Sequence, residues 1–172
     1  MKNLYIDFDG VIMNTIEITY EELKKLNLDS DNLEDQEKIR NFYASIDWNE
    51  LLNKKASIIN DAIKCIKKLI DSEQFNIAIL SHVNSLDEAI EKVKYIRKHF
   101  KDITFIPVPR DIEKTEMVHV EDAILIDDYA GNLEAWKKAG GVAIKFSTKL
   151  NGKGFVVIDR LDQILELSYV NN

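Results

Sequence analysis

Short apolar runs alternate with amphipathic segments along most of this chain, and this alternation restricts the possible fold more than any other feature. Most runs are apolar at consecutive positions, as expected of strands that helices cover on both faces. The runs lie at residues 4–8, 76–80, 103–108, 123–126, 142–146 and, as an edge strand, 155–158. Alternating strands and helices are typical of a parallel sheet with right-handed crossovers. The sequence therefore predicts an α/β, Rossmann-like parallel sheet with helices on both faces.

The segments between these runs carry helix signals. Ser85 and Glu88 have the spacing of a capping box, which predicts a helix over residues 85–100. Two further helices are predicted over residues 132–139 and 159–167.

The stretch between the first two strands breaks the alternation, because it contains no convincing strand pattern. It indicates helices over residues 15–26, 34–44, 48–53 and 58–71. This is longer than an ordinary crossover between parallel strands. We therefore predict a small helical cap inserted after strand 1 at residues 15–71, with its last helix returning to a catalytic core of residues 1–14 and 72–172.

Length, charge and cysteine content restrict the class of protein. A chain of 172 residues suits one compact domain. Acidic residues exceed basic ones, 30 against 23, which disfavours a sequence-independent grip on a nucleic-acid polymer. The single cysteine, Cys65, fits a reducing compartment and is expected to be buried. With no signal peptide or membrane-length apolar run, we expect a cytoplasmic protein that does not bind a membrane.

Polar side chains follow four of the predicted strands. They are Asp7 and Asp9 after the first, Ser81 after the second, Lys114 after the third, and Asp127 and Asp128 after the fourth. Ligands of parallel sheets gather beyond the carboxyl ends of the strands, so we expect these groups to meet there. Two carboxylates ~4 Å apart repel by ~4 kcal/mol at an effective dielectric constant of about 20. Such a cluster needs a basic side chain and a hard cation, and oxygen ligands favour Mg²⁺.

The order of these motifs resembles that of the haloacid dehalogenase superfamily of phosphohydrolases. The matching segments are YIDFDGVIMNT, IAILS, Lys114 and AILIDD, within residues 4–146. The segment ILIDDYAGNLEAWKKAGGVAIKF, together with the helical insertion, is most similar to the small 5′-nucleotidase and 5′(3′)-deoxyribonucleotidase-like branch. The resemblance implies a Mg²⁺-dependent phosphomonoesterase that acts on a small phosphorylated metabolite, with a nucleoside monophosphate favoured.

The resemblance also implies the catalytic roles. Asp7 is expected to attack phosphorus and to form an aspartyl-phosphate, which divides one difficult hydrolysis into two easier steps. Asp9 is expected to protonate the leaving group and then to take a proton from water. Gly10 is expected to let the chain turn sharply beside the phosphate.

Two binding sets follow from the same resemblance. The phosphate-binding set is Ser81, Lys114, Gly10 and, at the rim, His82. The metal set is Asp7, the backbone carbonyl of Asp9, Asp128, and Asp127 as a second ligand or a support. In these sets Lys114 acts as a point charge on the phosphoryl oxygens.

Other functions remain open at this point. The same chemistry suits a sugar phosphate or another small metabolite. A phospho-accepting receiver domain also combines carboxylates, a hydroxyl, a lysine and Mg²⁺, but here the D-x-D motif comes first and the adjacent acidic pair comes late. A non-catalytic binding domain is a third interpretation, against which the intact set of acids argues.

Several single residues have a structural and a functional interpretation. Tyr43 and Trp48 in the insertion are candidates for stacking on a nucleobase, although aromatic residues in small helical units are more often packing anchors. Trp136 is expected to pack its helix onto the sheet. His99 and His119 are isolated and are expected to be structural or surface groups.

Overall fold

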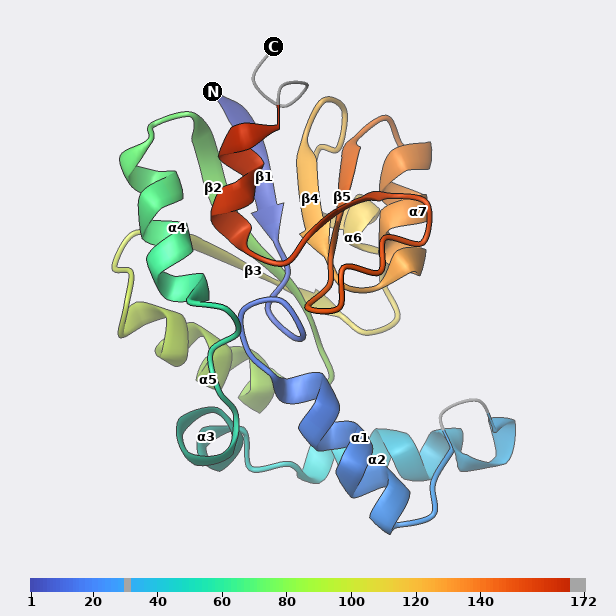
Figure 1. Ribbon diagram of the computed structural model, residues 1–172. Helices are drawn as coiled ribbons and strands as arrows, with labels where there is room; N and C mark the ends of the chain where they lie inside the picture. Colours follow the sequence, from blue (N-terminus) through green and yellow to red (C-terminus); the bar gives the residue numbers. More distant parts are fainter. Residues whose placement is uncertain (30–31, 168–172) are drawn as a thin grey trace.

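The computed structural model describes residues 1–29 and 32–167, and a six-stranded parallel sheet forms its centre (Figure 1). The strands are β1 (Lys2–Ile6), β2 (Phe75–Val83), β3 (Thr104–Pro109), β4 (Ile124–Asp127), β5 (Val142–Phe146) and β6 (Val156–Ile158). They lie in the order β3-β2-β1-β4-β5-β6, and every neighbouring pair is parallel. The predicted α/β, Rossmann-like fold class is confirmed, and each predicted strand is present within a few residues of its expected bounds.

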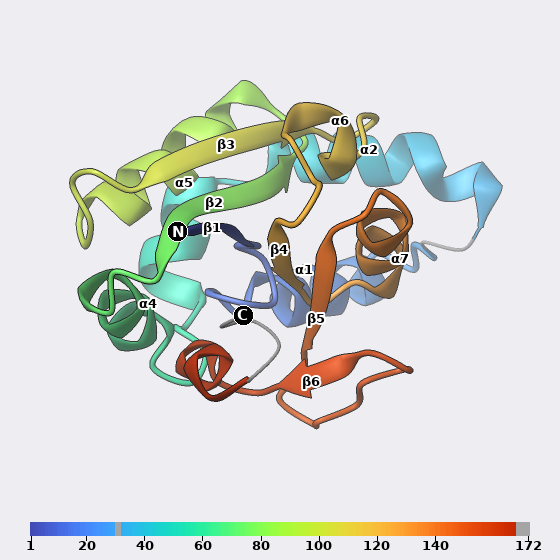
Figure 2. The same ribbon diagram turned by 90° about the horizontal axis from the view of Figure 1, so that it is seen from above.

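Helices cover both faces of the sheet (Figure 2). One face carries α4 (Ala62–Asp71), α5 (Leu86–Arg97) and the 3₁₀ helix η3 (Leu161–Glu166), and the other carries α6 (Lys114–Met117) and α7 (Ala130–Lys138). Successive residues of a strand point to opposite faces, so each face has its own apolar cluster.

The residues of β2 illustrate this division. Ile79 joins the cluster under α4 and α5, and Leu80 joins the cluster under α7. Trp136 of α7 is fully buried in the second cluster, and its indole N–H donates to the carbonyl oxygen of Ala123 at 3.0 Å. The predicted packing role of Trp136 is confirmed.

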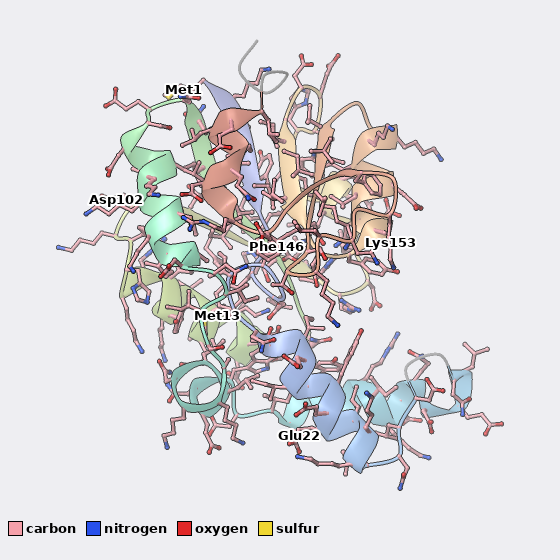
Figure 3. The ribbon with its side chains drawn as sticks, in the orientation of Figure 1. Met1, Met13, Glu22, Asp102, Phe146 and Lys153 are labelled. Atoms are coloured by element: carbon pink, nitrogen blue, oxygen red, sulfur yellow. The ribbon has the colours of Figure 1, made fainter. Side chains whose placement is uncertain are left out.

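Five helical elements connect β1 to α4 in the part of this stretch that the structure describes. They are α1 (Thr15–Lys25), the 3₁₀ helix η1 (Leu33–Asp35), α2 (Gln36–Ser45), α3 (Trp48–Glu50) and the π-helical turn η2 (Leu51–Lys55). Helices α1 and α2 project beyond the carboxyl end of the sheet (Figure 1). Figure 3 shows Met13 where the chain leaves the sheet, and Glu22 on the projecting α1.

Two predicted helices differ from the structure. The helix expected from residue 58 begins only at Ala62, because Asn60 and Asp61 have left-handed φ angles of 42° and 57°. The preceding segment instead pairs with the turn after β1, where the Ile59 N–H donates to the carbonyl oxygen of Ile12 at 2.9 Å. The predicted C-terminal helix is a 3₁₀ helix, not an α-helix.

Cys65 is buried in α4, as predicted, and burial raises the pKa of its thiol. Its sulfur donates to a carboxylate oxygen of Asp162 in η3 at 3.3 Å, which links the helix to the C-terminal segment. Within residues 1–29 and 32–167, none of the helices has the length and apolar character that crossing a bilayer requires.

Candidate active site

Three carboxylates meet at the carboxyl edge of the sheet, where the strand order reverses between β1 and β4. Asp7 follows β1, Asp127 ends β4, and Asp128 comes next. The Asp7 N–H donates to the carbonyl oxygen of Ile126 at 2.9 Å, which holds the two strand ends together. One oxygen from each of the three carboxylates lies within 4.8 Å of the other two. Such reversal points are where ligands of α/β sheets bind.

Lys114 bridges two of these carboxylates from the start of α6. Its side chain is 2% exposed, and its Nζ lies 2.9 Å from Oδ1 of Asp7 and 2.7 Å from Oδ2 of Asp127. Burial lowers the pKa of Lys114, but Asp127 and Asp7 outweigh burial and hold that pKa above its ordinary value. Asp127 also accepts hydrogen bonds from the Tyr129 N–H at 2.8 Å and from Asn132 at 2.9 Å. Both oxygens of Asp127 are therefore occupied by protein donors.

The negative charges of Asp7 and Asp128 are less fully offset by neighbouring donors and cations. Burial raises the pKa of Asp7 to about 7, although Lys114 opposes the shift. Burial, together with the charges of Asp7 and Asp127, raises the pKa of Asp128 to about 8. Lys145 of β5 donates to the backbone carbonyl of Asp128 and compensates its carboxylate only in part. Buried carboxylates in this state suit a divalent cation, whose charge offsets theirs.

Gly10 makes room for the carboxylate of Asp128. Its φ angle is 73°, in the left-handed region, and a Cβ atom there would meet Oδ2 of Asp128 at 2.3 Å. A cavity of about 650 Å³ opens beside this contact, lined in part by Gly10, Asp128 and Lys145. The donor set and the space beside it fit Mg²⁺, which keeps several waters when bound by a few carboxylates.

Asp9 faces a second group of side chains. Its Oδ1 accepts from the hydroxyl of Thr15 at 2.6 Å, and its Oδ2 accepts from Nζ of Lys92 at 2.5 Å. The hydroxyl of Ser81 lies 3.3 Å from the same Oδ2. Lys92 also contacts Oε1 of Glu88 at 2.6 Å. The structure thus joins the predicted residues Asp9 and Ser81 directly and through Lys92. Neither Lys92 nor Thr15 is among the site residues expected from the sequence.

Glu88 has a role beyond the capping box that its spacing from Ser85 predicts. Its N–H donates to the hydroxyl of Ser85 at 3.1 Å, as the capping box predicts. Its carboxylate, however, is buried and accepts from Nδ2 and the backbone N–H of Asn84. A sequence signal existed, because positions 88 and 92 lie on the same helix face as the buried Ala89 and Ile96, and charged residues rarely occupy such a stripe.

The predicted rim residue His82 and the two aromatic candidates for base stacking, Trp48 and Tyr43, have partners other than the three clustered carboxylates. His82 has its Nε2 at 2.9 Å from the carbonyl oxygen of Ile112, and burial lowers its pKa. Its neighbour Ser81 points to the opposite face of β2, so the two side chains do not share one rim. Trp48 is 5% exposed and its ring centroid lies 4.9 Å from Nζ of Lys92, so its packing role is confirmed and stacking on a nucleobase is wrong for this residue. Tyr43 packs partly buried against the same apolar cluster.

Comparisons with known proteins identify the fold. No family model matches the chain, and no curated protein matches its sequence. A solved hydrolase from Pseudomonas syringae matches with a TM-score of 0.65 at 13% identity, over 96% of this chain and 97% of that one. A phosphonoacetaldehyde hydrolase-like protein from Oleispira antarctica matches with a TM-score of 0.66 at 13% identity, over 99% and 92%. A HAD phosphatase from Thermococcus onnurineus matches with a TM-score of 0.60 at 17% identity, over 96% and 97%.

These likenesses support the fold that the sequence resemblance implies, but they do not test its nucleotidase branch. The chain has the fold of haloacid dehalogenase (HAD) superfamily hydrolases over nearly its whole length. The three neighbours are described as a hydrolase, a phosphonoacetaldehyde hydrolase-like protein and a phosphatase, and none of them as a nucleotidase.

Proposed function

We propose that this protein is a cytoplasmic, Mg²⁺-dependent phosphomonoesterase of the HAD superfamily that works through an aspartyl-phosphate on Asp7. One observation carries the proposal: the carboxylates of Asp7, Asp127 and Asp128 lie within 4.8 Å of one another, beside the ammonium of Lys114. A phosphatase needs a nucleophile, a cation and a phosphate-binding group at one place, and this edge of the sheet supplies residues suited to each.

Asp7 is oriented for attack through one of its two oxygens. The Phe8 N–H at 2.8 Å and Nζ of Lys114 at 2.9 Å both bind Oδ1. This leaves Oδ2 as the oxygen that attacks phosphorus. Lys114 stays charged beside it and binds the phosphoryl oxygens as the negative charge on them is redistributed.

The metal set would be Asp7, the backbone carbonyl of Asp9 and Asp128. Asp127 acts as a support, because its oxygens already accept from Lys114, Asn132 and a backbone N–H. Mg²⁺ bound by this set would supply positive charge between the nucleophile and the phosphoryl oxygens. The three protein oxygens leave room for waters and for one oxygen of the ester.

Asp9 is the proton-transfer group of the proposal. Its carboxylate accepts hydrogen bonds from the hydroxyl of Thr15 at 2.6 Å and from Nζ of Lys92 at 2.5 Å, which fix its orientation. In the first step Asp9, entering the reaction protonated, would give its proton to the leaving oxygen. In the second step it would take a proton from the water that attacks the aspartyl-phosphate, which restores the protonated form for the next turnover. Ser81, whose hydroxyl lies 3.3 Å from Oδ2 of Asp9, would contact a phosphoryl oxygen of the bound ester.

The substrate proposed is a small phosphorylated metabolite, with a nucleoside monophosphate first and a sugar phosphate second. Residues 15–71 would act as the cap that selects the leaving group, with α1 and α2 over the carboxyl end of the sheet and α4 in the core (Figure 1). The nucleotide preference rests on the sequence resemblance. Tyr43 is the remaining aromatic candidate for contact with a base, since Trp48 is buried under Lys92.

A phosphate-release screen over nucleotides and sugar phosphates, with Mg²⁺ and with a chelator, tests this proposal. The expected result is repeated turnover of at least one ester with Mg²⁺ and none with the chelator. One phosphoryl group retained per chain would indicate a receiver domain instead. No release from any ester would indicate a non-catalytic binding domain.

A further inference from the structure

Lys92 is a buried cation outside all of the sequence motifs that suggested a phosphatase. It lies in α5, and its side chain has no exposed surface. Its Nζ is within hydrogen-bond distance of four acceptors: Oδ2 of Asp9 at 2.5 Å, Oε1 of Glu88 at 2.6 Å, the His82 carbonyl at 3.1 Å and Oγ of Ser81 at 3.2 Å. An ammonium has three protons to donate, so the group has no spare donor and is fixed in orientation.

The surroundings of Lys92 hold it in this place. Glu88 neutralises part of its charge and is itself anchored by the backbone N–H of Asn84 at 2.8 Å. The rings of Phe8 and Trp48 lie 5.4 and 4.9 Å from Nζ and cover it from water. Apolar residues of similar size often stabilise a core as well as a buried ion pair does, so stability alone does not account for Lys92.

The consequence for Asp9 is that both of its oxygens are held. Lys92 binds Oδ2, and the hydroxyl of Thr15 binds Oδ1 at 2.6 Å. The plane of the carboxylate is thereby fixed, while the Asp9 side chain remains 17% exposed. Proton transfer needs heavy atoms within about 2.6–3.2 Å of each other, and a misplacement of about 1 Å can slow a reaction by about 100-fold.

We propose that Lys92 is a positioning residue, which holds the carboxylate of Asp9 in the orientation used for proton transfer to the leaving group. The inference rests on the proposed phosphatase function and extends it to a residue of α5. The competing interpretation is purely structural, with Lys92 as a charge that the core merely tolerates.

The contacts of Lys92 determine which variants test its role. Lys92→Met keeps the length of the side chain and removes the ammonium. Because it leaves Glu88 buried without its cation, a second variant combines Lys92→Met with Glu88→Gln. The matched control is Lys94→Met, the same substitution on the exposed side of α5, where the lysine side chain is 62% exposed.

The readout is the ratio of kcat/KM for two esters: the best alkyl phosphate found in the screen, and p-nitrophenyl phosphate. An alkoxide leaving group needs a proton from Asp9, whereas p-nitrophenolate leaves without one. The ratio also does not depend on the fraction of protein that is folded. We expect kcat/KM for the alkyl phosphate to fall by about 100-fold in the folded variant, with a much smaller fall for p-nitrophenyl phosphate and no change of the ratio in Lys94→Met.

The other outcomes are decisive. An equal fall for both esters, or no fall for either, would overturn the role of Lys92 and leave the phosphatase intact. Failure of both Lys92 variants to fold, judged by circular dichroism, would assign Lys92 to stability and overturn the proposal. If the unmodified protein hydrolyses neither ester, the proposed function fails first, and the inference fails with it.

Discussion

Replacing Gly10 with alanine places a methyl group against the carboxylate of Asp128. The new Cβ would stand 2.3 Å from Oδ2 and 2.8 Å from Cγ of Asp128, and real Cβ atoms essentially never approach closer than 3.0 Å. The carboxylate must therefore recede from 2.3 Å to at least 3.0 Å. Gly140 offers a matched control, because its φ is also positive, at 90°, and a Cβ there meets nothing within 4 Å.

The two substitutions separate backbone strain from displacement of Asp128. Both alanines adopt a left-handed φ, which costs roughly 1–2 kcal/mol. In a domain of this size that cost lowers the Tm by roughly 2–8 °C. Only Gly10→Ala also moves a proposed metal ligand, and disturbing the groups that orient a ligand typically weakens metal binding by about 10- to 100-fold.

Two measurements test this reasoning: the Tm, and the Mg²⁺ concentration that gives half-maximal phosphate release. We expect similar losses of Tm in the two variants, and a Mg²⁺ requirement raised by about 10-fold or more in Gly10→Ala alone. If Gly10→Ala requires no more Mg²⁺ than Gly140→Ala, Asp128 either moves without consequence or does not hold the ion. Either finding would refute the argument.

Three further predictions address the nucleophile, the metal and the C-terminal segment. Asp7→Asn should abolish phosphate release and keep a Tm near that of the unmodified protein, because the amide keeps the shape of the side chain; full activity would remove Asp7 from the mechanism. Asp128→Asn should shift the Mg²⁺ titration to higher concentration, and an unchanged titration would show that another group holds the ion. Hydrogen bonds from Arg160 and Lys68 lower the pKa of Asp162, so this carboxylate stabilises the fold above the ordinary carboxyl pKa and loses that effect as the pH falls toward its lowered value. Because these partners are exposed, Asp162→Asn should cost only about 1 kcal/mol at pH 7 in urea unfolding, and progressively less as the pH falls below the ordinary carboxyl pKa; equal stability at pH 7 would contradict this.

The strands were the most predictable part of the fold, since a strand covered on both faces must be apolar at consecutive positions. This local pattern also located the site, because Asp7 and Asp127 mark the ends of two such runs. The meeting of their carboxylates followed from a general property of parallel sheets and needed no knowledge of the particular contacts.

Features that depend on distant contacts were not predictable in the same way. The pair Glu88 and Lys92, four positions apart on a helix, has the spacing of an ordinary solvated ion pair. Its burial depends on Asp9, which lies 83 positions from Lys92 in the sequence. The late start of α4 has a similar origin, since the segment before it pairs with the turn after β1 through the bridge between Met13 and Ile58.

The balance of charge at the carboxyl edge ties the lysines and the proposed cation together. Hydrogen bonds, ion pairs and close charges join five carboxylates to three lysines there: Asp7, Asp9, Glu88, Asp127 and Asp128, with Lys92, Lys114 and Lys145. Fully ionised, this group carries two more negative charges than positive ones. Asp7 shares Lys114 with Asp127, and Lys145 offsets the charge of Asp128 only in part, so burial raises the pKa values of Asp7 and Asp128. A phosphate monoester is itself an anion, so it can approach Asp7 only once that surplus is neutralised, and a divalent cation carries the matching charge.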